Sequence, residues 1–443
     1  MNPKISWSSG LALTVLLVSA ALTACGYKTT TYSTPPTAVA LARYNANGTP
    51  DITNLVGGTG LVTTDVTPSQ DDIAFAVVVQ ADGKIIAVGS SFTTPKSVVV
   101  IRYNANGTPD TAFGNNGITV TSLPSASAHG FAATLQADGK LLVAGRSSSN
   151  FLLLRYTTSG ALDTANFGAP LGYVITAIPF GSESGAEAIA LSGSNILIAG
   201  HSKIGGTFAI ALAQYTTSGT LDSTFGSGGI VTTPIGSLDA DAAALAVQSD
   251  GKIVAAGLAG NAMSQIWDVA LLRYNANGSL DTTSGFGGST GIVTTDIGSS
   301  SNYANAVALQ ADGKIVVAGN AFANPFAGTS DIAVLRYNTD GSLDTTGFGG
   351  GNGFVTTNVS GFDNGFAVAV QPLDGKIVVA GNADAGIADR LALLRYNADG
   401  SPDSGFGTGG IVTRAASGPS TITGAFAVAM QPADGAIVVV GYD

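Results

Sequence analysis

The sequence has few of the residue types that most enzymes and metal centres use. Its 443 residues include one cysteine, Cys25, and two histidines, His129 and His201. A single cysteine excludes an internal disulfide and a cysteine-based metal cluster. The chain also has no HExxH motif, and its one GxSxG match, residues 287–291, falls in a glycine-rich turn of the repeat, so neither a zinc-protease helix nor a nucleophile elbow is predicted. We expect both histidines to lie in connections at the ends of strands, where a lone histidine is usually solvated.

Charged residues are scarce as well. Asp, Glu, Lys and Arg make up 11% of the chain and leave a net charge of −11, whereas roughly 25% is usual for soluble proteins. Six Arg and five Lys recur at fixed places in a repeat, which leaves seven of the 18 basic residues scattered. Because no basic stripe is available to neutralise phosphates, we expect no nucleic-acid partner.

A long apolar run, Leu11–Leu22, lies near the N-terminus. It is too short to span a bilayer and is typical of a signal-peptide core. It ends in Leu-Thr-Ala-Cys25, which resembles the bacterial lipobox, although an ordinary secretory signal with an incidental cysteine is the alternative. We predict a signal peptide over residues 1–24 and a lipidated flexible tether over residues 25–37. By the same resemblance, Gly26 in place of Asp implies the outer membrane, reached through the lipid alone.

Glycine is abundant, at 60 residues, because the chain repeats itself. Versions of AVALQADGKIVVAG alternate with versions of ALLRYNANGSLDTT. The tyrosine of the second segment occurs seven times, and 352 residues over six intervals give a period of about 59: Tyr44, Tyr103, Tyr156, Tyr215, Tyr274, Tyr337 and Tyr396. A period of that size, made of strand-like pieces, predicts a repeat scaffold.

Each repeat contains four predicted strands. Asp312-Gly313 between two apolar runs favours a tight hairpin, since a type I′ turn needs positive φ at both central residues. An Ala-rich strand precedes this turn, and the predicted strands Lys314–Gly319, Ile332–Tyr337 and Phe354–Thr357 follow it. Four short antiparallel strands per unit are typical of a β-propeller blade, with the Ala-rich strand innermost where the blades converge.

The chain begins and ends on complementary halves of the repeat. It contains seven Ala-rich hairpins, the last being Ala425–Gly441, and seven tyrosine modules, the first beginning near Val39. We therefore predict an all-β, seven-bladed β-propeller over residues 38–443. Its last blade would join N- and C-terminal strands, which hides the sheet edges. We expect a monomer.

The repeat text resembles the delta-60 repeat family of bacterial envelope and secreted proteins. The resemblance rests on the elements QADGKIVVAG, LLRYNANGSLDTT, FG and GIVTT, and it covers about residues 38–443. It implies a propeller-like fold. The family carries no established common activity, so the resemblance implies no particular chemistry.

Two charged positions recur in the repeat. An Asp follows the turn glycine at Asp51, Asp110, Asp163, Asp222, Asp281, Asp344 and Asp403, and an Arg precedes the tyrosine at Arg43, Arg102, Arg155, Arg273, Arg336 and Arg395. A buried Arg needs an anionic partner, so we predict a structural Arg–Asp brace. The Asn- and Asp-rich turns leave Ca²⁺ loops as the alternative, but the alternating ligands and bidentate Glu of an EF-hand are missing.

Variation between the copies indicates the binding face. The Asp-Gly and NANGSLD turns share one side and are nearly constant, whereas the connections on the other side vary, and recognition usually occurs on variable loops. Two of these connections, residues 258–267 and 321–330, carry Trp267, Phe322 and Phe326. Such aromatics either pack on their own blades or contact a partner. We expect a non-enzymatic cell-envelope scaffold, without a cofactor, that binds a protein or glycan through this face.

The alternative function is a Ca²⁺-dependent hydrolase or lyase with acidic residues at the channel mouth. Propeller blades can assemble carboxylates from several repeats, and seven of them lie before or near the start of Ala-rich strands: Asp71, Asp72, Glu183, Glu187, Asp239, Asp241 and Asp363. This hypothesis requires several carboxylates within reach of one ion, whereas the binding hypothesis requires an exposed loop surface.

If Cys25 is the acylated residue, metabolic labelling with a fatty-acid probe will tag the wild-type protein and will not tag Cys25→Ser. A serine variant that is labelled as strongly as the wild type would refute the lipoprotein assignment.

Overall fold

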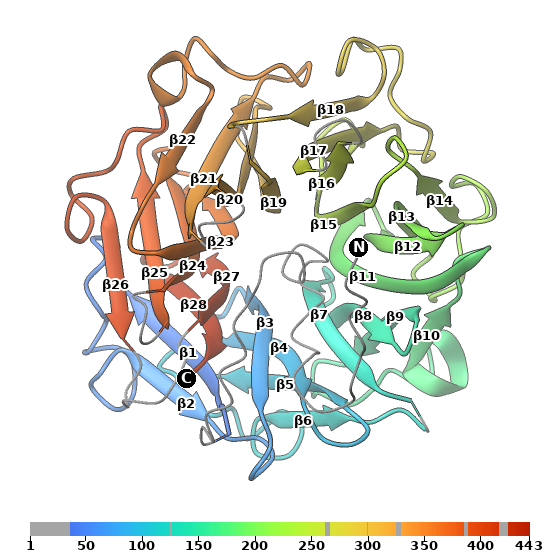
Figure 1. The fold of residues 1–443 in the computed structure, drawn as a ribbon. Coiled ribbons are helices and arrows are strands. Elements are labelled where there is room, and N and C mark those ends of the chain that lie inside the picture. Colours follow the sequence, from blue (N-terminus) through green and yellow to red (C-terminus); the bar gives the residue numbers. More distant parts are fainter. Residues whose placement is uncertain are drawn as a thin grey trace, which may run out of the picture.

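The computed structural model describes residues 36–124, 126–261, 266–298, 300–324, 329–384, 389–415 and 424–443. In these segments the chain forms 28 β-strands around a central axis (Figure 1). Two short helical turns, Gly168–Gly172 and Gly349–Gly351, lie in connections between strands. No described segment forms a helix of the length and apolar character needed to cross a membrane.

Five sheets contain four strands each, paired antiparallel. Four of them are consecutive meanders: β3 (Asp72–Val79), β4 (Ile85–Ser91), β5 (Ser97–Tyr103) and β6 (Ile118–Thr121); β7 (Ala128–Leu135), β8 (Leu141–Ser147), β9 (Asn150–Tyr156) and β10 (Tyr173–Thr176); β11 (Gly181–Ser192), β12 (Asn195–Ile204), β13 (Thr207–Tyr215) and β14 (Ile230–Thr233); β15 (Ala240–Val247), β16 (Ile253–Asn261), β17 (Ile266–Tyr274) and β18 (Ile292–Thr295). The fifth joins the two ends of the chain: β1 (Val39–Tyr44), β2 (Leu61–Thr64), β27 (Gly424–Met430) and β28 (Ile437–Tyr442).

The remaining eight strands form one larger sheet. It contains β19 (Asn302–Leu309), β20 (Ile315–Asn324), β21 (Thr329–Tyr337), β22 (Phe354–Thr357), β23 (Phe362–Val370), β24 (Ile377–Asp384), β25 (Asp389–Tyr396) and β26 (Ile411–Ala415). A single parallel bridge between Ser330 and Phe362 merges two four-strand meanders here. Within the described residues the pairing therefore gives six sheets, and not the seven separate sheets that the sequence predicts.

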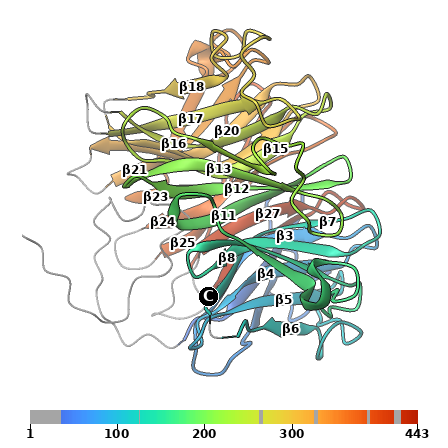
Figure 2. The ribbon, with the colours of Figure 1, turned by 90° about the vertical axis from the view of Figure 1, so that its right-hand side faces the viewer.

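The Ala-rich strands are innermost. Each contacts the inner strand of the next repeat, and β27 contacts β3, so these contacts run all the way round the axis. From the side, successive sheets fan out about that axis (Figure 2). Small side chains suit these positions because the sheets are closest together near the axis. Further out, large apolar side chains fill the space between sheets, as where Val143 and Leu152 pack beside Val98.

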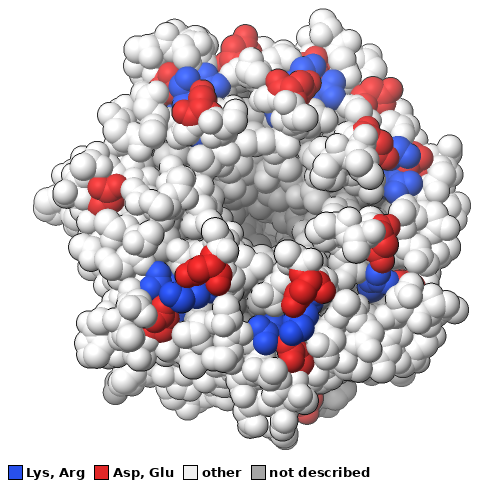
Figure 3. All heavy atoms as spheres, turned by 180° about the vertical axis from the view of Figure 1, so that it is seen from behind, with Lys and Arg blue, Asp and Glu red and all other residues white. Residues whose placement is uncertain are grey.

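The inner strands also line a channel. In each one the half nearest the Asp-Gly turn is partly exposed, whereas the other half is largely buried, as the pattern of β3 illustrates. The side that carries the Asp-Gly turns, called the turn face below, is hollowed at its centre, with paired clusters of opposite charge around the hollow (Figure 3). The opposite side is called the loop face. The channel is thus open toward the turn face and narrows part-way along the inner strands.

The two ends of the chain share one sheet. β1 pairs antiparallel with β28 over six residue pairs, from Val39–Tyr442 to Tyr44–Ile437. Outside the strands, Ala38 and Asp443 exchange two backbone hydrogen bonds at 3.0 and 3.1 Å. The complementary half-repeats at the two termini therefore meet in a single four-stranded unit.

The recurrent Arg and Asp come together in the third strand and the turn that follows it. The Arg Nε donates to an oxygen of the Asp eight residues later, in Arg102–Asp110 at 2.8 Å, Arg155–Asp163 at 3.0 Å, Arg273–Asp281 at 2.8 Å, Arg336–Asp344 at 2.9 Å and Arg395–Asp403 at 2.7 Å; Arg43 pairs with Asp51. Burial alone would raise the pKa of Asp344, but bonds from Lys314 and Arg336 outweigh it and hold that pKa far below its usual range. The carboxylates are therefore committed to protein cations.

Five of these Arg side chains also reach the neighbouring sheet, whereas Arg43 bonds Gln431 and Asp434 in the hairpin of its own sheet. Arg102 Nη1 donates to the carbonyl oxygen of Thr158 at 2.6 Å, and Arg273 Nη1 to that of Thr339 at 2.5 Å. Arg395 makes the same bond to Ala46, across the junction between the end and the beginning of the chain. We call this Arg–Asp pair with its bond to the next turn the clasp. The clasp of Arg395 spans the junction between the two ends of the chain, as four other clasps span junctions between consecutive repeats.

Deleting residues 424–443 removes β27 and β28 and leaves β1 without its partner. Because an unpaired strand edge templates association, we expect the truncated protein to form oligomers or aggregates and to unfold at a lower temperature than the full chain. Size-exclusion chromatography with light scattering and a thermal melt measure both effects. A truncated protein that stays monomeric with an unchanged melting temperature would show that the terminal strands do not close the ring.

Candidate functional site

Each inner strand contains a β-bulge near its middle, where one residue is skipped in the pairing with the second strand. A glycine lies opposite every bulge. A Cβ atom at Gly319 would collide with the carbonyl oxygen of Tyr303, and one at Gly381 with that of Asn364. The recurrent glycine that ends QADGKIVVAG is therefore required by close backbone approach, and it permits the bulge.

The skipped residues form what we call the bulge ring: Phe75, Phe131, Glu187, Ala243, Asn305, Phe366 and Phe426. Bulges re-aim side chains, and these meet across repeats. The ring centroid of Phe75 lies 5.4 Å from that of Phe131 and 5.3 Å from that of Phe426. Phe366 lies 4.9 Å from Phe426. Because Phe75 contacts its counterparts on both sides, these side chains lie near the axis.

The other part of the bulge ring is polar or small. Asn305 Nδ2 donates to Asn320 Oδ1 at 3.0 Å and to the carbonyl oxygen of Gly365 at 2.9 Å. The network continues from Asn320 to Asn364 and from Asn364 to Asn382. The floor of the channel thus has four phenylalanines on one side and amides, a carboxylate and an alanine on the other.

Glu187 belongs to a buried cluster with His201 of β12 and Asp241 of β15. His201 Nδ1 lies 3.2 Å from Glu187 Oε1 and 3.3 Å from Asp241 Oδ2. The side chains are 1%, 4% and 4% exposed for His201, Glu187 and Asp241, respectively. The prediction that His201 lies in a solvated connection is wrong, because β12 continues past Gly200 to Ile204 and pairs His201 with Ile210 of β13 in the interior.

Burial and charge act in opposite directions on this cluster. Burial lowers the pKa of His201, but the charges of Asp241 and Glu187 outweigh it and raise that pKa above its usual value. For Glu187, burial and the charge of Asp241 both raise the pKa of the carboxyl. A cation at this place therefore stabilises both carboxylates in their charged form.

The second histidine lies on the adjacent sheet with two basic side chains. His129 lies in β7, is buried, and stacks on Phe131 with 5.4 Å between the ring centroids. The prediction that this histidine lies in a connection is therefore also wrong. Burial lowers its pKa to about 3, with Lys96 and Arg146 contributing. Burial likewise lowers the pKa of Lys96 to about 8. Arg146 Nη1 lies 3.8 Å from Glu183 Oε1. His129 is therefore neutral, and none of the ion pairs among the described residues joins it to a carboxylate.

The other carboxylates that the sequence singled out do not converge. Asp72 Oδ2 accepts backbone hydrogen bonds from Val66 and Thr67 at 2.8 Å, and Asp363 accepts from Val359 at 2.6 Å. Asp71 and Asp239 also accept backbone N–H groups. Because these side chains satisfy connections between sheets, Glu187 and Asp241 are the pair from that set that meets.

The aromatic residues expected on loops lie mainly in strands. Trp267 is half-buried in β17, and Phe322 is 6% exposed in β20, because β16 and β20 extend into the segments predicted to be loops. Phe322 packs 5.3 Å from Tyr303 and 5.6 Å from Phe362, and Trp267 lies 6.4 Å from Tyr303. We call these four residues the loop-face cluster. The third candidate, Phe326, and the lipidation candidate, Cys25, lie outside the described residues.

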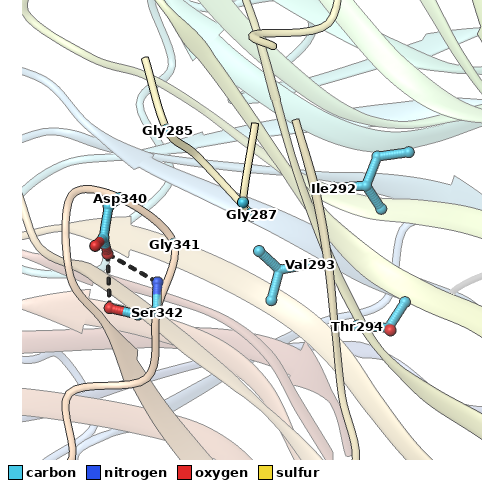
Figure 4. A pocket seen from close by; sticks show the side chains of 9 residues that line it. Gly285, Gly287, Ile292, Val293, Thr294, Asp340, Gly341 and Ser342 are labelled. Carbon is cyan, nitrogen blue, oxygen red and sulfur yellow. Dashed lines mark hydrogen bonds between the residues drawn. The ribbon is translucent and has the colours of Figure 1, made fainter. Parts of the chain in front are cut away.

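A shallow pocket lies between the outer turns of two repeats, lined by Gly285, Gly287, β18 and the turn at Asp340 (Figure 4). Its acidic side chain is already engaged, since Asp340 Oδ1 accepts from the Ser342 backbone N–H at 2.9 Å and from the Ser342 hydroxyl at 2.6 Å. The bulge ring and the buried cluster are therefore better candidates for a functional site than this pocket.

Six segments match the family model described as a domain of unknown function (DUF5122) β-propeller: residues 80–113, 136–165, 195–225, 248–283, 310–346 and 373–406. The chain therefore carries six segments that match repeats of this family. These are the delta-60 repeats, so the resemblance drawn from the sequence is confirmed. No protein of curated function matches the chain.

Several solved structures are similar to this chain at low sequence identity. Virginiamycin B lyase from Staphylococcus aureus is 11% identical, with a TM-score of 0.47 over 91% of this chain and 99% of that chain. Sqt1 from Chaetomium thermophilum is 12% identical, with a TM-score of 0.44 over 83% and 95%. An ulvan lyase is 12% identical, with a TM-score of 0.42 over 72% and 80%. These likenesses carry no argument about the function of this chain.

Replacing Gly319 by Ala puts a Cβ atom against the carbonyl oxygen of Tyr303 and forces the bulge to move. We expect the free energy of unfolding in urea to fall by about 3 kcal/mol, as for overpacked interior sites. Gly298→Ala is the control, because nothing lies within 4 Å of a Cβ atom there, and its effect should stay within about 0.5 kcal/mol. Equal stability of the two variants would show that the glycine opposite the bulge is dispensable.

Proposed function

We propose that the protein is a lipid-anchored, seven-bladed β-propeller of the bacterial cell envelope that binds a glycan at the bulge ring and does not catalyse a reaction. The count of seven rests on the seven inner strands and on the single bridge that merges two meanders. The anchor rests on the Leu-Thr-Ala-Cys25 segment, and the address in the outer membrane rests on Gly26.

The observation that carries the proposal is the two-sided composition of the bulge ring. A sugar ring presents apolar C–H faces and an edge of hydroxyl groups. Phe366 and Phe426 are partly exposed and offer aromatic surface for the apolar face. Next to Phe366 in the ring, Asn305 is partly exposed and offers its amide oxygen to the hydroxyl groups, because its Nδ2 already donates two hydrogen bonds. Concave sites with apolar walls and a few polar groups are typical of small-ligand recognition.

The route to this site fits a ligand without strong charge. The hollow of the turn face leads along the partly exposed halves of the inner strands, which are mainly Ala and Val. The lysines at its rim are paired with acids of their own turns, as in Lys140–Asp138 at 3.3 Å and Lys252–Asp250 at 3.2 Å. Paired charges cancel at a distance, so the rim exerts little steering on a charged ligand.

The loop-face cluster is the second candidate, for docking a protein. Trp267 and Phe362 are half-buried at its two ends and span three repeats. Aromatic anchors of this kind dominate many protein interfaces. The two candidates lie toward opposite faces, so single substitutions separate them.

An array of chitooligosaccharides, peptidoglycan fragments and neutral cell-surface polysaccharides, followed by titration calorimetry with the best binder, tests the proposal. We expect Phe426→Ala to weaken binding at least fivefold, because it removes aromatic surface from the bulge ring, and Trp267→Ala to leave it unchanged. Melting temperatures of both variants serve as the folding control.

Two results would contradict the glycan proposal. One is a wild-type protein that binds no glycan on the array. The other is binding that Trp267→Ala abolishes and Phe426→Ala preserves, which would assign recognition to the loop face.

A further inference from the structure

We propose that Glu187, His201 and Asp241 form a binding site for one first-row divalent metal ion, with Zn²⁺ as the best-matched ion. The three side chains come from neighbouring repeats. Glu187 is the bulge residue of β11, His201 follows Gly200 in β12, and Asp241 lies near the start of β15. The same bulge that builds the channel floor therefore presents the first ligand.

The distances favour shared coordination of an ion. One atom of each side chain lies within 4.8 Å of the other two, and Nδ1 of His201 is 3.2 and 3.3 Å from the two carboxylate oxygens. Ligands about 2.0–2.2 Å from a tetrahedral Zn²⁺ lie about 3.3–3.6 Å from one another. A charge-assisted hydrogen bond would be shorter, at about 2.7–2.9 Å. The spacing thus matches ligands around an ion better than a direct ion pair.

The polar atoms of the cluster lack hydrogen-bond partners among the described residues. Five buried atoms are without such a partner: both oxygens of Glu187, both ring nitrogens of His201 and Oδ1 of Asp241. Buried polar groups are almost always satisfied. One N–H at Nδ1 could serve only one of the two carboxylates, whereas a cation between them serves all three ligands.

The position in the ring gives a second reason. The third strand of this repeat carries Gln214 where the other repeats carry the recurrent Arg, so its clasp to the next repeat is missing. Asn195 Nδ2 instead donates to Asp222 at 2.7 Å within the repeat. The proposed metal site joins β11 and β12 to β15, which is the junction that the missing clasp would hold.

The ligand set also selects the ion. Ca²⁺ and Mg²⁺ take oxygen ligands, whereas one imidazole with two carboxylates is a set used for Zn²⁺ and its neighbours. Two carboxylates and a neutral imidazole balance a divalent charge. At the adjacent repeat the bulge residue is Ala243, whose methyl side chain leaves more room than a phenylalanine would.

The proposal is tested by titration calorimetry and elemental analysis of the full chain without any affinity tag. The protein is first stripped of metal with EDTA and then titrated with ZnCl₂. We expect one Zn²⁺ per chain, and at least 100-fold weaker binding in Glu187→Gln and His201→Gln, because each removes a ligand. Zinc should also raise the melting temperature of the wild type and not of these variants. Glu187→Gln preserves shape, so it keeps the test valid if His201→Gln does not fold.

Matched controls use the same residue types outside the cluster. His129→Gln and Glu183→Gln should bind Zn²⁺ as the wild type does. The proposal is overturned if the wild type binds no Zn²⁺, if CaCl₂ binds and ZnCl₂ does not, or if the ligand variants bind as tightly as the controls. None of these readouts depends on glycan binding, so the two proposals fail separately.

Discussion

In every repeat a carbonyl oxygen of the inner strand occupies the place where the second strand would otherwise carry a Cβ atom. This contact allows only glycine on the second strand, and it accompanies the extra residue that bulges from the first. The bulged side chains then meet around the axis. The floor of the channel, the four phenylalanines and the carboxylate of Glu187 all follow from one local backbone arrangement repeated round the ring.

A second recurring interaction holds the repeats at a constant spacing. The Arg of the third strand neutralises a buried Asp and donates to a carbonyl oxygen of the next turn, so the same side chain stabilises its own turn and the junction beside it. Buried charges are tolerated because they are paired. One repeat carries Gln214 in place of the Arg, so it lacks the clasp to the next repeat. The same repeat contributes Glu187 and His201 to the buried cluster, and the next repeat contributes Asp241. The cluster therefore lies at a junction that no clasp holds.

Much of this fold could be predicted from the sequence. Asp312-Gly313 and its equivalents define hairpins, and the predicted strand Phe354–Thr357 has the bounds that the structure shows. The site could not be predicted in the same way. Glycine inside a strand signals a bulge, but in the sequence Gly319 cannot be distinguished from the many glycines of turns. Only the structure shows that the carbonyl oxygen of Tyr303 lies against it. Nor does spacing along the chain reveal that His201 and Asp241, forty residues apart on adjacent sheets, lie 3.3 Å from each other.

A crystal structure of the chain would test the central claim most directly, since the claim concerns where the inner strands place their bulged side chains. The account predicts a break in pairing on every inner strand, a glycine opposite each break, and Phe75 in contact with both Phe131 and Phe426 at the axis. Inner strands that pair without interruption, or a Phe75 side chain turned away between two sheets, would contradict it.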